Sequence, residues 1–122
     1  MTITTVDLHD QPHVRASASQ RTTVLSWDAG EGVDHYGKPC RDVVTLTCMH
    51  STGAKGFTAS LRREQESDGV RSFAVFDFVT ICRRPVARYS AKALDDFVEF
   101  ALLYARDADA PKVQAILTGT PQ

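Results

Sequence analysis

The chain has 122 residues, of which 43% are apolar and 24% are charged, so its size fits one domain and its composition excludes a wholly disordered chain. Its 14 lysines and arginines nearly balance 15 aspartates and glutamates, and the net charge of −1 gives no overall field that would attract nucleic acid or an anionic membrane. No apolar run approaches the roughly 18 residues of a membrane helix, and the first residues lack the basic and apolar stretches of a signal peptide, so we expect a cytoplasmic protein.

Residues 1–20 are polar, contain Pro12 and show no sustained apolar period, which is typical of a flexible N-terminal arm in which one edge strand could form. The distribution of apolar residues changes after Arg21. Residues 22–27 are rich in β-branched and aromatic side chains and predict the first strand, which the glycine-rich stretch that follows interrupts. We therefore expect residues 21–122 to form a single folded domain.

Three further strands are predicted in the middle of the chain. Residues 42–50 alternate between two faces and predict the second strand. After a turn-type segment at 51–56, residues 57–62 predict a third strand that forms a hairpin with the second. Residues 71–83 predict a long fourth strand with apolar side chains on both faces, as in a strand that is covered on both sides, and Pro85 ends or bends it.

The last part of the chain predicts two helices. Ser90 is suited to cap a long helix from residue 91 to about residue 106, because apolar residues recur there at helical spacing. A short second helix is predicted after it, with Asp109 as its N-cap, Pro111 in its first turn and Gly119 beyond its end.

The long helix has a second apolar stripe that one sheet cannot cover, formed by Phe100, Leu103 and Tyr104. The short second helix is one candidate to cover this stripe. A second copy of the chain is the other, because an uncovered apolar patch usually marks an interface. We therefore expect a homodimer through Phe100, Leu103 and Tyr104.

These elements together predict an α+β fold. The connections between the strands are too short for crossover helices, which favours a two-layer domain with a four-stranded antiparallel meander, followed by a long C-terminal helix and a short second helix. In its element order alone, four strands and then a helix, this layout resembles the single-strand-binding coactivator and Whirly-type folds. That resemblance implies a nucleic-acid-binding sheet, but no motif residues carry it.

The connection at residues 28–42 is predicted to be long and irregular, because it contains several glycines and a proline. Long irregular loops in compact domains are often functional, and tyrosine and tryptophan supply rigid contact area. The leading hypothesis is therefore a non-catalytic protein that acts through protein–protein contact, as a regulator, inhibitor or immunity-type factor. The candidate partner-binding residues are Trp27, Glu31, Asp34, His35, Tyr36 and Lys38. The opposing interpretation is a mobile connection without a role.

The alternative function is a dimeric single-stranded nucleic-acid-binding protein that uses its sheet surface, since basic grooves with aromatic platforms bind single strands. The candidate residues are Lys55, Arg62, Arg63, Arg71, Phe76, Phe78, Arg83 and Arg84. Residues 71–78 also match part of the RNP1 pattern, but an RNA-recognition motif has a helix between its first two strands, where this chain has the glycine-rich connection. The opposing interpretation, favoured by the net charge, is that these arginines solvate strand edges and that the phenylalanines belong to the core.

No recognised catalytic or metal-binding motif is present. His35, Cys40, Cys48 and His50 are spaced unlike the structural zinc patterns, and we predict no metal, no cofactor and no catalytic residues. An enzyme that pairs one of these cysteines with one of these histidines is a third hypothesis, which requires a tertiary contact between them. Three cysteines without an export signal are expected to stay reduced.

Overall fold

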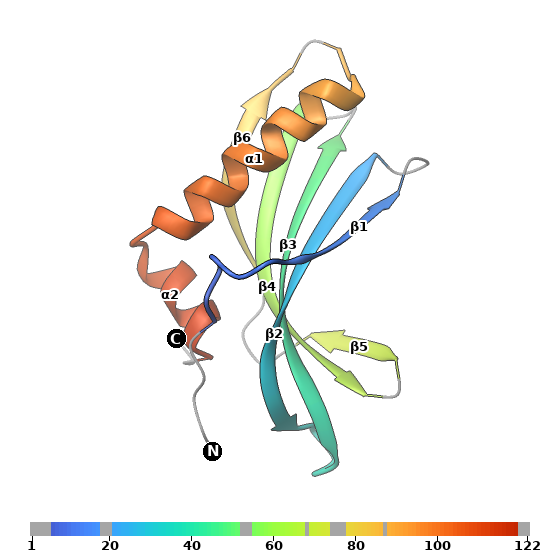
Figure 1. The fold of residues 1–122 in the computed structure, drawn as a ribbon, viewed down its shortest axis with the longest axis vertical. Coiled ribbons are helices and arrows are strands. Elements are labelled where there is room, and N and C mark those ends of the chain that lie inside the picture. The colour runs from blue at the N-terminus through green and yellow to red at the C-terminus, as the bar shows by residue number, and fades with distance from the viewer. Residues whose placement is uncertain are drawn as a thin grey trace.

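The computed structural model describes residues 6–17, 21–51, 55–67, 69–73, 78–86 and 88–119. They form an antiparallel sheet with two helices against one of its faces, so the α+β class is confirmed (Figure 1). The strands are β1 (His13–Ser17), β2 (Thr22–Val33), β3 (Pro39–Ser51), β4 (Gly56–Ser67), β5 (Val70–Phe73) and β6 (Val79–Pro85), and the helices are α1 (Ala91–Asp107) and α2 (Pro111–Thr118). No helix in this part of the chain is long and apolar enough to span a membrane.

The sheet has six strands in the described residues, so the predicted count of four is wrong. The order β1-β2-β3-β4-β5 follows the chain, and β6 also pairs with β4. One further strand is β1, an edge strand beside β2 that lies in the N-terminal segment where the sequence allowed one. The other arises because residues 71–83, predicted as one strand, contain parts of two strands that both pair with β4. Phe73 pairs with Glu64 whereas Val79 pairs with Leu61, and one continuous strand cannot satisfy both registers.

β2 and β3 form a longer hairpin than the sequence predicted. The irregular connection expected at residues 28–42 is wrong, since strand pairing reaches Val33 and begins again at Pro39. Gly30 does not end the strand, because it takes a φ of 103° at a β-bulge next to Asp28, a conformation that glycine tolerates. The hairpin extends beyond the helices (Figure 1). The predicted two-layer arrangement therefore applies to only part of the sheet.

The two helices lie close to their predicted bounds. Ser90 caps α1 as expected, and its hydroxyl accepts a hydrogen bond from the Ala93 amide at 3.1 Å. The N-cap of α2 is Ala110, which makes no side-chain cap hydrogen bond, so the predicted Asp109 cap is wrong. Gly119 follows α2 in the left-handed conformation, with a φ of 75°, as a terminating glycine does.

The core lies between the sheet and the two helices. Leu46 of β3 and Leu61 of β4 are fully buried. Phe97 of α1 stacks on Phe57 of β4, with ring centroids 5.2 Å apart. The buried residues of α2 are Val113, Ile116 and Leu117. The apolar period of each helix is thus explained by the sheet face that the helix covers.

The N-terminal segment takes part in this core. Val6 and Leu8 are buried in the same group of side chains as the helices. The Leu8 carbonyl accepts a hydrogen bond from Nε of Arg106 at 2.7 Å, and the Asp10 carbonyl accepts one from the indole nitrogen of Trp27 at 3.1 Å. The described part of the expected N-terminal arm therefore packs on the domain.

A buried arginine joins α2 to the sheet. The side chain of Arg63 in β4 is only 7% exposed, and its Nη2 lies 3.2 Å from Oδ2 of Asp42. Its Nη1 donates to the carbonyl oxygens of Leu117 and Ile116, at 3.2 and 3.4 Å. These carbonyls belong to the last turn of α2, where the helix dipole is negative. The guanidinium is therefore paired both by a carboxylate and by the end of a helix.

We expect Arg63→Ala to lower the free energy of unfolding by about 3 kcal/mol, because the substitution leaves a partly buried carboxylate and two helix carbonyls without their partner. Arg41→Ala is the matched control, since Arg41 pairs with Asp28 while both side chains are about half exposed. The control should cost less than about 1 kcal/mol. Urea unfolding followed by circular dichroism measures both values. Equal losses would show that Arg63 does not anchor α2.

Candidate functional site

The β2–β3 hairpin ends in a tight turn at residues 34–38. The Asp34 amide donates to the Lys38 carbonyl at 2.9 Å, and the Gly37 amide donates to the Asp34 carbonyl at 3.0 Å. The Asp34 carboxylate also accepts hydrogen bonds from the amides of Tyr36 and Lys38, at 2.8 and 2.9 Å. Gly37 has a φ of 78°, which the turn requires. The turn is therefore held in one shape by its backbone and by one side chain.

This turn presents an exposed surface that we call the hairpin tip, formed by Val33, His35, Tyr36 and Lys38. Tyr36 is 83% exposed and Val33 is 62% exposed. The His35 ring meets the Tyr36 ring edge to face, with centroids 5.3 Å apart. The tip lies at the end of the molecule to which neither helix extends (Figure 1). A fixed turn with an exposed tyrosine offers contact area at a small cost in conformational entropy.

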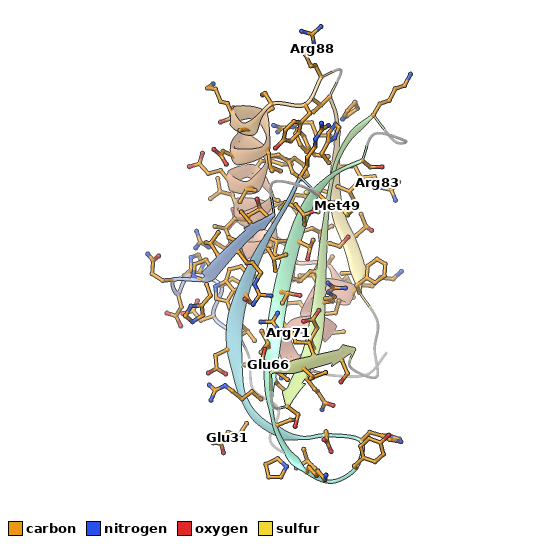
Figure 2. All side chains as sticks on the ribbon, turned by 90° about the vertical axis from the view of Figure 1, so that its right-hand side faces the viewer. Glu31, Met49, Glu66, Arg71, Arg83 and Arg88 are labelled. Carbon is orange, nitrogen blue, oxygen red and sulfur yellow. The ribbon has the colours of Figure 1, made fainter. Side chains whose placement is uncertain are left out.

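Most of the predicted partner-binding residues lie in this turn, namely Asp34, His35, Tyr36 and Lys38. Trp27 does not, because it is 3% exposed and its indole bonds to the N-terminal segment. Glu31 is exposed but lies within β2, where it pairs with Arg41 of β3 (Figure 2). Sequence reasoning missed Val33, since strand alternation was not expected to continue that far. The sequence feature that could have identified Val33 is its position as an apolar β-branched residue directly before a turn.

Three of the arginines predicted to bind nucleic acid have protein partners instead. Arg63 lies in the core. Nε of Arg62 lies 2.6 Å from the Glu64 carboxylate. Arg71 contacts Glu64 at 3.2 Å and Glu66 at 2.8 Å. These carboxylates balance the arginine charges locally and reduce the field that a phosphate backbone would experience.

The other predicted nucleic-acid-binding residues lie elsewhere. Lys55 and Arg83 are exposed toward the end of the sheet opposite the hairpin tip, and Figure 2 shows Arg83 well separated from Arg71 along the sheet. Arg84 lies over an aromatic ring of α1, 4.4 Å from its centroid. Phe78 is 50% exposed, and Phe76 lies outside the described residues. The structure does not bring the described members of this set together on one surface.

The second apolar stripe of α1, which we call the α1 stripe, is exposed. Phe100 is 38% exposed, Leu103 is 58% exposed and Tyr104 is 46% exposed. α2 packs against β4 and β6 instead, so the idea that α2 covers the stripe is wrong. The ring centroids of Phe100 and Tyr104 are 6.3 Å apart, and a hollow of 330 Å³ adjoins them. The stripe is therefore a second surface suited to protein contact.

The residues considered for metal binding do not assemble into a site. Among the residues that the structure describes, no group of three His, Cys, Asp or Glu side chains is placed to hold a metal ion. His50 packs against the rings of Phe57 and Tyr89, with centroids 5.4 and 5.2 Å away. Its surroundings are those of a structural aromatic contact.

The three cysteines lie in surroundings that keep a thiol protonated. Burial raises the pKa of Cys48 to about 12. Burial also raises the pKa of Cys82, and the pKa of Cys40 is raised by burial and by the neighbouring Asp42 carboxylate. A nucleophilic cysteine requires the opposite shift, toward the thiolate.

Comparison with protein-family models, with curated proteins and with solved structures found no match. The hairpin tip and the α1 stripe are therefore judged on their own geometry. They lie on different elements, because the tip belongs to the β2–β3 hairpin and the stripe belongs to the outer side of α1.

We expect Cys48 to escape alkylation at pH 8 in the folded protein, because a thiol with a pKa of about 12 is ionised in about one molecule in ten thousand. Brief treatment with iodoacetamide followed by peptide mass spectrometry measures the labelling. The same treatment in denaturant is the control, in which every cysteine should react. Rapid labelling of Cys48 in the folded protein would contradict this expectation and favour the cysteine–histidine enzyme.

Proposed function

We propose that this chain is a small, non-catalytic cytoplasmic protein that acts by binding another protein, as a regulator, inhibitor or immunity-type factor. The hairpin tip makes the contact. The observation that carries the proposal is the tip itself, where Tyr36 is 83% exposed above a turn closed by the Asp34 carboxylate.

The geometry of the tip supports this role in two ways. The turn is ordered before binding, so little backbone entropy is lost when a partner docks on it. The tip also projects beyond the helices, and a partner can reach it without displacing another element (Figure 1). Tyrosine is among the residues that most often dominate binding energy at protein interfaces.

The alternative, a dimeric single-stranded nucleic-acid-binding protein, has less support. Arg63 is in the core, and Arg62 and Arg71 are ion-paired with carboxylates of the same sheet. The arginine-rich sheet surface on which this alternative depends is therefore largely neutralised by neighbouring groups.

Replacing the tip side chains is expected to weaken partner binding about 30-fold, as removal of an interface hot spot does. The variant is Val33→Ser combined with Tyr36→Ser. The partner is captured from an extract of the native host by the wild-type protein and identified by mass spectrometry. Its recombinant form is then titrated against both proteins by biolayer interferometry.

The control for this test is Met49→Ser combined with Val70→Ser, which removes exposed apolar side chains away from the tip. The control should bind the partner as the wild type does, and both variants should keep the wild-type melting temperature because the changes are on the surface. A tip variant with unchanged affinity would exclude the tip as the contact surface.

We also propose that two copies of the protein associate through the α1 stripe. The stripe exposes two aromatic rings and a leucine on one helix face, and aromatic residues are enriched at the centres of protein interfaces. A two-fold symmetric pair would bring the same stripe from both copies together. A dimer of this kind presents two hairpin tips to its partner.

Leu103→Glu is expected to convert the dimer to a monomer, because the pairing would bury two carboxylates without partners. Light scattering coupled to size-exclusion chromatography measures the mass of both proteins. Val70→Glu, a substitution at a similarly exposed position outside the stripe, should leave the dimer intact. A monomer mass for the wild type at micromolar concentrations would contradict the proposed interface.

A further inference from the structure

The sheet face opposite the helices contains a hollow of 390 Å³ that extends from β1 across to β5. Figure 2 views this face, with Glu66 and Arg71 near its middle. The ionisable lining residues are His13 and Arg15 of β1, Asp28 of β2, Arg41 of β3, Glu66 of β4 and Arg71 of β5. We call this hollow the open-face groove.

The backbone explains why a groove forms here. The register of β2 against β3 shifts between Asp28 and Gly30, and a β-bulge of this kind increases the local bend and twist of a sheet. β5 pairs only with the last residues of β4, from Glu64 to Ser67. No helix covers this face of the sheet (Figure 1), and polar side chains of its strands line the hollow.

The arginines that line the groove differ in how they are paired. Arg41 pairs with Asp28, and Arg71 contacts Glu66 through Nε at 2.8 Å. Arg15 has no ion-pair or hydrogen-bond partner among the described residues. Three guanidinium groups and two carboxylates line the hollow, and a third carboxylate, that of Glu64, contacts both Arg71 and Arg62. The cation without a carboxylate partner among the described residues is therefore Arg15.

The three arginines differ in how many of their N–H groups remain available to donate a hydrogen bond to a ligand. Arg71 is held in place by two carboxylates, because its Nη1 also lies 3.2 Å from Glu64, and its Nη2 makes no hydrogen bond to the described residues. The side chain of Arg41 is 56% exposed. Arg15 is exposed and has all of its donors available. Guanidinium groups at such positions bind the oxygens of carboxylates and phosphates in pairs.

We propose that the open-face groove binds a small anion that carries a carboxylate or a phosphate group. Arg15 and Nη2 of Arg71 donate to the anion, and the apolar side chain of Val43 contacts the rest of the molecule. The volume of the groove lies within the range of small-molecule sites. A single strand of nucleic acid fits less well, because the large aromatic side chain in the described lining, that of Trp27, is buried and offers no face for stacking a base, which leaves His13 as the exposed ring.

The test is an NMR titration of the isotope-labelled full chain with sodium phosphate, with sodium acetate and with a thymidine oligonucleotide, each at low chloride concentration. We expect phosphate or acetate to shift the amide signals of His13, Arg15, Ser26 and Val43 in a saturable way, with a Kd of about 1 mM. The anion that binds more tightly identifies the group on the natural ligand.

Arg15→Gln is the informative variant, because Arg15 makes no contact that the described fold requires. It should weaken anion binding about tenfold, as expected for the loss of one charge-assisted pair. Arg83→Gln is the control, since Arg83 is exposed away from the groove (Figure 2) and should leave the affinity unchanged. The proposal is overturned if neither small anion shifts these signals, if Arg15→Gln binds as the wild type does, or if only the oligonucleotide binds.

Discussion

The position of α2 depends on one buried charge. A guanidinium group inside a protein core must be paired, and Arg63 finds its partners in Asp42 and in the last carbonyls of α2. This constraint fixes α2 against β4 and β6. Because α2 is held there, it does not reach the outer side of α1, and Phe100, Leu103 and Tyr104 stay exposed. The surface proposed for dimerisation is thus a consequence of where a single arginine is paired.

A second constraint comes from the bulge in β2. Gly30 lets the strand continue through an irregular position, so that β2 and β3 reach far past the helices. The same irregularity lies beside Asp28 and Arg41, which line the open-face groove, and a bulge increases the local bend and twist of a sheet. The exposed tip and the groove therefore have one structural origin. A strand without the bulge would be expected to give a flatter sheet with a shallower polar face.

The sequence predicted those features that depend on local pattern. α1 and its Ser90 cap follow from helical spacing and capping chemistry, and the exposure of Tyr36 follows from its place in a turn. Features that depend on distant contacts were not predictable. Trp27 is buried in the core and bonds to the N-terminal segment 17 positions away, and Arg63 is paired with residues 53 and 54 positions away. A glycine can either end a strand or form a bulge within a strand that continues. The residues around Gly30 do not show which of these two outcomes applies.

The internal carboxylates of the groove set limits on what it can bind. Asp28 and Glu66 already neutralise two of its arginines, so an incoming anion must compete with groups that are held nearby by the sheet. Because the Arg41–Asp28 pair is half exposed, separating it costs little, whereas Arg71 is fixed by two carboxylates and offers one remaining nitrogen. Binding therefore favours an anion that reaches Arg15, which has no carboxylate partner among the described residues. A ligand that contacted only the paired arginines would gain too little to displace water from a charged surface.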